Sequence, residues 1–179
     1  MVSSMSRNED ADRFHSRKNP RLEQFDYRSP NYYFITICTR NKVCLFGEPD
    51  ACNYYGCVAE EKLKEIPRHF PGVALDQFVV MPNHIHAILI LSGDSNLSSV
   101  VGLYKSAVTR ELRKENPEIR VWQTSFHDHI IRNQADYERI WNYIHTNPAR
   151  WMDDCFYTPE SGKESGLIGG VMTPPYKIN

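Results

Sequence analysis

The stretch QFVVMPNHIHAILIL, residues 77–91, decides the fold of this 179-residue chain. It contains two apolar runs separated by Pro82 and Asn83, and a Pro-Asn step inside a strand pattern signals a turn or a bulge. We favour two antiparallel strands, residues 72–81 and 84–91, over one broken strand. Alternate side chains of a strand share a face, so His84 and His86 project side by side from the second strand.

The histidine pair has more than one interpretation. Two neutral imidazoles whose Cα atoms are about 7 Å apart can bind one metal ion between them. The alternative is that each imidazole makes an ordinary hydrogen bond at a sheet edge. A second pair with the same spacing, His127 and His129 in SFHDHII, leaves open a zinc site that is built from all four histidines.

The segments around this stretch predict alternating strands and helices. Residues 32–39 (YYFITICT) form a strand, and residues 119–132 are extended. Apolar spacing predicts helices at residues 59–70, 97–115 and 134–147, the first disturbed and the last ended by a proline. The order β-α-β-β-α-β-α indicates an α+β fold, a ferredoxin-like antiparallel sheet of four strands with an added C-terminal helix. The strand that carries both histidines is central in such a sheet.

The chain as a whole reads as one domain with two irregular ends. We expect a flexible N-terminal arm at residues 1–30, a domain at residues 31–154 and an irregular C-terminal tail at residues 155–179. There is no run of 18 apolar residues and no apolar leader segment, which excludes a membrane span and a signal peptide. Five cysteines without a C-x-x-C motif favour reduced thiols and a cytoplasmic location. The net charge of −1 does not indicate a general polyanion binder.

The helix predicted at residues 134–147 places two polar side chains on one face. Tyr143 and Asn147 are four residues apart and therefore lie one helical turn apart. Four residues form the neighbouring stripe that we expect to face the core: Tyr137, Ile140, Trp141 and Ile144. A phenol, an amide and two imidazoles can therefore converge. The alternatives are that Tyr143 is a packing residue and that Asn147 ends the helix before Pro148.

Two motifs, VMPNHIHAILIL and YIHTNPARW, resemble the single-tyrosine HUH transposases, in particular the REP-associated tyrosine transposases of the transposase IS200-like family. In the HUH motif two histidines flank an apolar residue, here Ile85. Its combination with Tyr-Ile-x-x-Asn-Pro is specific. The resemblance extends over about residues 31–154, whereas the segment after Trp151 is shorter than the tails of many relatives.

The resemblance implies a reaction and a set of site residues. The reaction is that of a metal-dependent tyrosine transposase, an endonuclease and strand transferase that cleaves and rejoins single-stranded DNA with hairpins through a 5′-phosphotyrosine intermediate. Tyr143 is then the nucleophile, and His84, His86 and Asn147 bind a divalent metal ion. Histidine with oxygen ligands suits Mn²⁺ and tolerates Mg²⁺, and Zn²⁺ is a further option. For the general base, His145 and water both stay open.

Positive charge is concentrated on the helix predicted at residues 97–115. We expect Lys105, Arg110 and Arg113 of this helix to contact DNA phosphates, together with the N-terminal arm. The alternative is a solvated face, since the helix dipole by itself favours cations near a helix C-terminus.

Three other functions remain in competition. A host-domesticated, non-mobile regulator would bind DNA hairpins without cleaving them, although the complete set of site residues argues against it. An RNA-binding module would need an RNP-like aromatic strand, a pattern that residues 32–39 lack. A zinc hydrolase would use both histidine pairs. The sequence leaves monomer and homodimer open and predicts no membrane partner.

Overall fold

The structure, a computed structural model, describes residues 31–93 and 95–157. The arm predicted at residues 1–30 and the tail beyond residue 157 lie outside the described residues. The main sheet has the strand order β4-β5-β1-β6, and every neighbouring pair is antiparallel. Its strands are β1 (Asn31–Cys38), β4 (Val73–Met81), β5 (His84–Leu91) and β6 (His127–Ile131). The predicted α+β, ferredoxin-like fold is confirmed, and β5 is central as expected.

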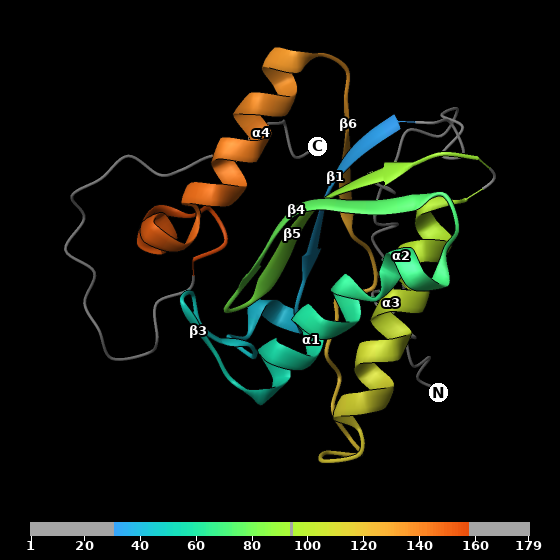
Figure 1. Ribbon diagram of the computed structural model, residues 1–179. Helices are drawn as coiled ribbons and strands as arrows, with labels where there is room; N and C mark the ends of the chain where they lie inside the picture. The colour runs from blue at the N-terminus through green and yellow to red at the C-terminus, as the bar shows by residue number, and fades with distance from the viewer. Residues whose placement is uncertain (1–30, 94, 158–179) are drawn as a thin grey trace, which may run out of the picture.

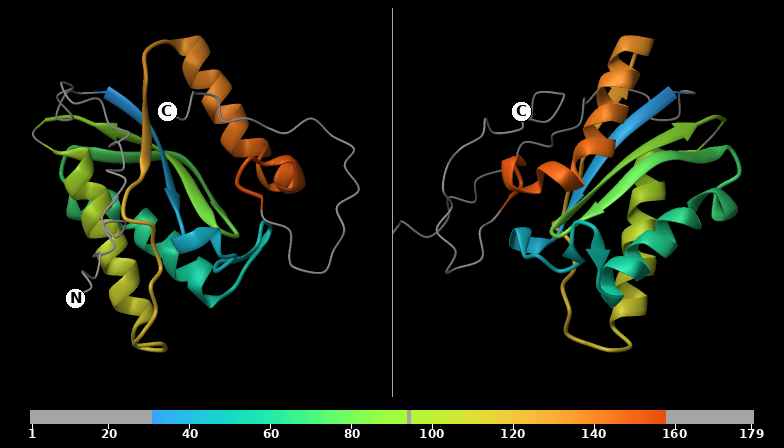
Figure 2. Two further views of the ribbon diagram at one scale, coloured as in Figure 1. Left: turned by 180° about the vertical axis from the view of Figure 1, so that it is seen from behind. Right: turned by 60° about the vertical axis from the view of Figure 1, so that its left-hand side comes forward.

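Helices cover both faces of this sheet, as Figures 1 and 2 show. α1 (Tyr54–Lys64), α2 (Ile66–His69) and α3 (Leu97–Leu112) lie on one face, and α4 (Gln134–Thr146) crosses the other. A short 3-10 helix, η2 (Pro148–Asp153), follows α4 where irregular structure was expected after residue 150. None of the helices within residues 31–93 and 95–157 is long and apolar enough to cross a membrane.

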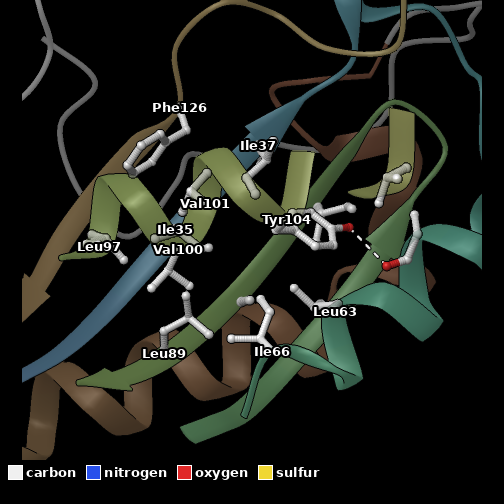
Figure 3. Packing of buried hydrophobic residues seen from close by; sticks show 14 of the residues in the cluster. Ile35, Ile37, Leu63, Ile66, Leu89, Leu97, Val100, Val101, Tyr104 and Phe126 are labelled. Carbon is white, nitrogen blue, oxygen red and sulfur yellow. Dashed lines mark hydrogen bonds between the residues drawn. The ribbon is translucent and has the colours of Figure 1, made fainter. Parts of the chain in front are cut away.

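The larger core lies between the sheet and the helices α1 and α3 (Figure 3). Ile35 and Leu89 point into it from β1 and β5, and Val100 meets them from α3. The buried Tyr104 hydroxyl donates a 3.0 Å hydrogen bond to the carbonyl oxygen of Ala59, which ties α3 to α1. Because alternate residues of β5 enter this core, the residues between them face α4.

A smaller core fills the space under α4. It comprises Phe34, Ile88, Ile131, Ile140, Tyr143 and Ile144. The stripe predicted for α4 is therefore wrong at one position, since Tyr143 is buried at 7% exposure while Trp141 is only half-buried and stacks on His145. Tyr137 packs at the margin of this core, as a partly buried residue.

The helix predicted at residues 59–70 is longer at its start and broken near its end. It begins at Tyr54, because the Asn53 side chain caps it by accepting a 3.0 Å hydrogen bond from the Gly56 N–H. It ends at Lys64, and the short helix α2 continues, because Pro67 has no N–H with which to extend the ladder of α1.

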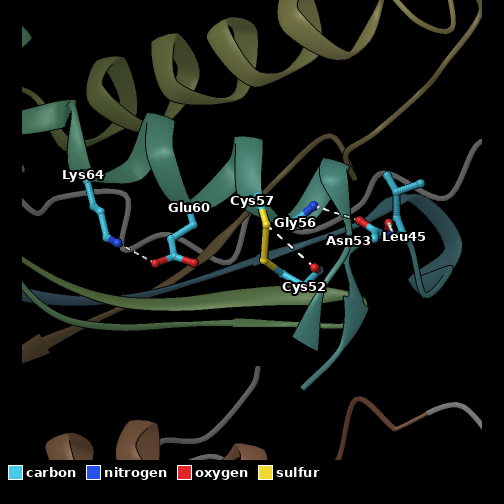
Figure 4. Close-up of a disulfide and its surroundings, with 7 residues drawn as sticks. All are labelled: Leu45, Cys52, Asn53, Gly56, Cys57, Glu60 and Lys64. Carbon is cyan, nitrogen blue, oxygen red and sulfur yellow. Dashed lines mark hydrogen bonds and ion pairs between the residues drawn. A yellow bond between two sulfur atoms is a disulfide. The ribbon is translucent and has the colours of Figure 1, made fainter. Parts of the chain in front are cut away.

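A disulfide joins the start of α1 to a small hairpin, β2 (Gly47–Glu48) and β3 (Ala51–Cys52), as Figure 4 shows. The bond links Cys52 and Cys57, whose Cα atoms are 5.7 Å apart, within the usual range for disulfides. The expectation of reduced thiols is therefore wrong for this pair, because the turn from β3 into α1 brings the two residues together. Cys38, Cys44 and Cys155 form no disulfide within the described residues.

Replacing Cys57 with serine should lower the free energy of unfolding by about 2 kcal/mol, since the loop that the disulfide closes is short. Urea denaturation of the oxidised protein measures the difference. Cys44→Ser is the matched control, because Cys44 is an exposed cysteine that takes no part in the disulfide. An equal loss in both variants would show that the disulfide adds nothing to stability.

Pro82 and Asn83 form the turn between β4 and β5, so the interpretation of two strands is confirmed. Met81 and His84 pair directly across the turn. The Pro82 carbonyl oxygen accepts hydrogen bonds from the backbone N–H groups of Leu45 (2.8 Å) and Phe46 (3.0 Å). The turn that precedes His84 is thereby fixed to the loop that follows β1.

Candidate active site

His84 and His86 lie in the middle of the sheet on the face that α4 covers. The ladder places His84 beside Cys38 and His86 beside Thr36 of β1. Both imidazoles are fully buried, and their ring centroids are 4.4 Å apart. Since β5 has a paired strand on each side, the alternative of hydrogen bonds at a sheet edge is excluded.

Asn83 fixes the orientation of the His84 ring. Its Nδ2 donates to the carbonyl oxygens of Phe156 (2.8 Å) and Lys42 (3.2 Å), so its Oδ1 is the acceptor of the 2.8 Å bond to His84 Nδ1. His84 therefore carries its proton on Nδ1 and presents the lone pair of Nε2. That buried Nε2 has no hydrogen-bond partner within the described residues. An imidazole oriented through its other nitrogen is typical of metal ligands.

His86 is contacted through both ring nitrogens. Thr36 Oγ1 lies 2.8 Å from Nδ1, and the Tyr143 hydroxyl lies 3.3 Å from Nε2. Burial lowers the pKa of His86 to about 3. Burial and the proximity of His86 also lower the pKa of His84 well below its usual value. Both imidazoles are therefore neutral near pH 7, and the neutral form is the one that binds metal.

α4 and its C-cap bring Tyr143 to His86 and Asn147 to Asp154. The helix begins after Asn133, whose side chain caps it, and ends at Thr146 with Asn147 as its C-cap, because Pro148 cannot extend the ladder. The Tyr143 ring centroid is 5.1 Å from that of His86. Asn147 is fully buried. Tyr143 and Asn147 thus do have the packing and helix-ending roles of the alternatives. Tyr143 also reaches His86, whereas Asn147 contacts Asp154.

Asp154, which has no part in the sequence motifs, completes the cluster. Its Oδ2 accepts hydrogen bonds from Asn147 Nδ2 (2.8 Å) and the Tyr143 hydroxyl (3.3 Å), and its Oδ1 accepts one from the Phe156 N–H (2.6 Å). Burial raises the pKa of this carboxyl, although the hydrogen bonds oppose the increase. η2 turns the chain back toward α4, and only this turn brings Asp154 to the site. The acidic pair in RWMDDC is the one feature of the sequence that points to a carboxylate here, and it does not distinguish Asp154 from Asp153.

The donor atoms of the cluster fit a divalent metal ion. One ligand atom each from His84, His86 and Asp154 all lie within 4.8 Å of one another. Asn147 Oδ1, like His84 Nε2, is buried and has no hydrogen-bond partner in residues 31–93 and 95–157. An unsatisfied buried polar atom costs about 1–3 kcal/mol, so two of them in one cluster point to a missing ligand. Imidazole nitrogens with carboxylate and amide oxygens suit Mn²⁺, Mg²⁺ or Zn²⁺.

The second histidine pair does not join this cluster. His129 Nε2 is hydrogen-bonded to Asp136 Oδ2 at 2.8 Å. His127 pairs with Thr36 across the sheet and is half-buried on the face that α4 covers. In the described part of the chain, the candidate metal cluster contains neither residue, so the four-histidine zinc site has no support. His145 stacks on Trp141 at the exposed side of α4 and is likewise absent from the cluster.

The three cationic residues predicted to contact DNA lie on α3 and at its C-cap, on the other face of the sheet. Lys105 Nζ donates hydrogen bonds to the carbonyl oxygens of Gln123 (2.5 Å), Thr124 (3.3 Å) and Ser125 (3.3 Å), which ties α3 to the segment before β6. Arg110 and Arg113 are solvent-accessible. All three line one cavity of about 450 Å³ together with Ser106, Thr109 and Trp122.

The stability of the metal-free protein should fall as the pH drops below about 6.5. The unfolded chain protonates its histidines near that pH, whereas buried His84 and His86 stay neutral to much lower pH. Between its folded-state and unfolded-state pKa, each histidine lowers the free energy of unfolding by up to about 1.4 kcal/mol for each unit that the pH falls. The raised pKa of Asp154 acts in the opposite direction and offsets part of the loss at the acidic end.

Urea midpoints measured with a chelator at pH 7.5, 6.5, 5.5 and 4.5 test this dependence. The double variant His84→Gln/His86→Gln should show a shallower decline. A wild-type midpoint that stays constant down to pH 5 would contradict the buried neutral state of both rings.

The model of the transposase IS200-like family matches residues 29–147. The chain belongs to this family. The matched range includes the strand with the HUH motif and the helix with Tyr143, so the resemblance to single-tyrosine HUH transposases is confirmed at the level of the family. Membership in the transposase IS200-like family makes DNA transposition and DNA binding the general role of the protein.

Two curated proteins and one solved structure are similar to this chain. The chain is 36% identical over 169 residues to an uncharacterized protein of Haemophilus influenzae. The alignment covers 80% of this chain and 94% of that protein. It is 35% identical over 77 residues to the REP-associated tyrosine transposase of Escherichia coli, 42% of this chain and 44% of that protein. A solved REP-associated tyrosine transposase bound to a REP hairpin aligns with a TM-score of 0.60 at 24% identity, covering 73% of this chain and 74% of that one. This last likeness shows a shared fold.

Proposed function

We propose that the protein is a metal-dependent endonuclease and strand transferase that cleaves and rejoins single-stranded DNA with hairpins. The observation that carries the proposal is the position of the Tyr143 hydroxyl, 3.3 Å from both His86 Nε2 and Asp154 Oδ2. The proposed nucleophile lies beside the candidate metal ligands His86 and Asp154, and His84 Nε2 and Asn147 Oδ1 have no hydrogen-bond partner within the described residues. That combination serves phosphoryl transfer to a tyrosine.

The proposed reaction exchanges one ester bond for another. The Tyr143 oxygen attacks the scissile phosphate, a bond forms between them, and the bond to the 3′ oxygen of the other fragment breaks. The 5′ phosphate stays on the tyrosine, and the other fragment leaves with a free 3′ hydroxyl, whose proton balances the one that the phenol gives up. A phenoxide is a better leaving group than a sugar alkoxide, so a later 3′ hydroxyl can attack the phosphotyrosine and reseal the strand without ATP.

Residues around the nucleophile have separate tasks in this proposal. His84, His86, Asn147 and Asp154 would hold a divalent ion, which supplies charge stabilisation and orientation for the scissile phosphate when bound. Asn83 and Thr36 orient the two imidazoles. The Asp154 carboxylate accepts the hydrogen bond of the Tyr143 hydroxyl and so lies where the phenolic proton can be received.

The proposed substrate class is DNA that combines a hairpin with a flanking single strand. The solved protein of the same fold holds a REP hairpin, and the site in this chain has two imidazoles and a tyrosine for one phosphodiester. Incubating the purified protein with such DNA and Mg²⁺ or Mn²⁺ should give a covalent adduct that survives denaturing electrophoresis. Binding of hairpin DNA without any adduct under both metals would refute the proposed enzyme and favour the hairpin-binding regulator.

Neutralising Arg110 and Arg113 together should weaken DNA binding and flatten its salt dependence. Each lost phosphate contact removes about 0.7–0.9 from the slope of log affinity against log salt, so the double variant should lose about 1.5. Lys105 is a poorer choice for this test, because its removal also breaks backbone contacts within the fold. Lys64→Gln/Arg68→Gln, two exposed cations on α1 and α2, is the control. An unchanged slope in both variants would assign the arginines to a solvated face.

A further inference from the structure

A cavity of about 530 Å³ opens on the α4 face of the sheet, at the end of α4 remote from Tyr143. Tyr32, Ile90 and Ile131, which lie side by side on three neighbouring strands, line its sheet side. The rest of the lining comes from β4 and the start of α4: Asp76, Arg132, Asn133, Gln134 and Tyr137. The volume is within the range of small-molecule sites, about 300–1,000 Å³.

The aromatic part of this cavity is held in place and still accessible. Tyr32 is 42% exposed, a large fraction for a tyrosine on an inner strand. Its ring lies perpendicular to that of Tyr137, with the centroids 5.9 Å apart. The Tyr137 hydroxyl donates a 2.7 Å hydrogen bond to Asp76 Oδ2, which fixes Tyr137 to β4. The cavity therefore offers a supported aromatic ring to a planar ligand.

Polar groups suited to a nucleotide stand around the aromatic ring. Asp76 is exposed and its carboxylate is an acceptor, while the amides of Asn133 and Gln134 can both donate and accept. The guanidinium of Arg132 is exposed and forms no ion pair within residues 31–93 and 95–157. Stacking surface, edge-reading polar groups and one cation together are the combination by which proteins bind unstacked bases of single strands.

The position of the cavity connects it to the candidate active site. Tyr32 and Thr36 are four residues apart on β1 and face the same side, a separation of about 13 Å at the usual strand rise. Thr36 is hydrogen-bonded to His86. The separation of about 13 Å between Tyr32 and Thr36 corresponds to roughly four nucleotides at the B-form rise of about 3.4 Å per nucleotide. In an extended single strand it corresponds to fewer nucleotides.

We propose that this cavity binds one unstacked nucleobase of the DNA strand that is cut at the HUH cluster, a few nucleotides from the scissile phosphate. The inference rests on the proposed function for the identity of the strand. The base stacks on Tyr32, and the Asp76 carboxylate accepts from its exocyclic amino group. Adenine, cytosine and guanine carry such a group and thymine does not, so the cavity discriminates against thymine.

An abasic scan tests the proposal without requiring cleavage. The Tyr143→Phe protein is used throughout, and each nucleotide that flanks the hairpin is replaced in turn by an abasic site. One position should lower the affinity about 10-fold, the usual effect of losing one base stacked on an aromatic ring. In the Tyr32→Ala/Tyr143→Phe protein the penalty at that position should disappear, while penalties at other positions stay.

Two further variants make the test specific. Tyr54→Ala removes a tyrosine of similar exposure, 52%, from α1 and should leave the whole abasic profile unchanged. Asp76→Asn should reduce the preference for cytosine over thymine at the sensitive position, and it keeps the size of the side chain. Urea denaturation confirms that each variant is folded.

The outcomes separate this inference from the proposed function. If wild-type protein forms the covalent adduct but no abasic penalty depends on Tyr32, the nucleobase site is wrong and the enzyme stands. If a penalty depends on Tyr32 while wild-type protein forms no adduct, the site is correct and the proposed chemistry fails. A penalty that depends equally on Tyr54 would overturn the assignment to this cavity.

Discussion

Replacing Tyr143 with phenylalanine is expected to abolish strand cleavage and the covalent protein–DNA adduct, and to leave hairpin binding nearly unchanged. The variant loses only the hydroxyl that lies 3.3 Å from His86 Nε2 and Asp154 Oδ2. The ring keeps its packing against Phe34 and His86. Removal of a nucleophile lowers the rate by a factor on the order of 10⁴ or more. Denaturing electrophoresis of labelled DNA measures both products.

Tyr137 provides the matched control on the same helix. It is six residues from Tyr143, about 120° away around the helix axis. Its hydroxyl donates to Asp76, and this hydrogen bond raises the pKa of Tyr137 to about 12. Tyr137→Phe should therefore still form the adduct. Mass spectrometry of the trapped adduct decides between the two residues: DNA linked to Tyr137, or an active Tyr143→Phe protein, would end the proposed mechanism.

Replacing His84 or His86 with alanine is expected to remove divalent-dependent cleavage and to weaken metal binding by about 100-fold or more. Each change deletes one of the imidazoles whose ligand atom lies within 4.8 Å of that of Asp154. Even mutation of a residue that only hydrogen-bonds to a metal ligand typically lowers metal affinity about 10- to 100-fold. Asp154→Ala should weaken binding as well, since it removes the carboxylate of the cluster. Calorimetric titration with Mn²⁺ measures affinity apart from activity.

The second histidine pair supplies the control for this experiment. His127→Ala and His129→Ala remove imidazoles from the neighbouring strand β6 and should keep both metal binding and cleavage. His129 is engaged with Asp136 instead. If the β6 variants lose metal while the β5 variants retain it, the metal site has been assigned to the wrong pair.

Short-range patterns predicted most of the fold. Strand alternation places His84 and His86 on one face, and the Pro-Asn step marks the turn before them, because both depend on neighbouring residues alone. The sequence also identified the helix that carries Tyr143 and Asn147. It did not identify the rotation of that helix, which depends on packing: Tyr143 is buried where Trp141 was expected.

Asp154 and the disulfide could not be predicted for a different reason. Asp154 reaches the cluster because η2 reverses the chain after α4, and the hydrogen bonds that hold it there come from Asn147 and Tyr143. Cys52 and Cys57 meet because a two-stranded hairpin leads into α1. Contacts of the tertiary structure bring Asp154 to the cluster, whereas the two cysteines meet through a local turn that their spacing alone did not indicate.

The segment around Asp154 affects how tightly the protein binds the proposed DNA substrate. Phe156, beyond the domain boundary predicted at residue 154, lies with its ring centroid 4.7 Å from that of His84, and Trp151 lies 6.0 Å away. In the proposed reaction, a phosphodiester could contact the two histidines, both at 0% exposure, only after some of the side chains around them shift. The measured dissociation constant therefore equals the intrinsic one divided by the fraction of molecules already open. A change at Trp151 or Phe156 that favours the open form would raise apparent affinity without adding any contact to DNA.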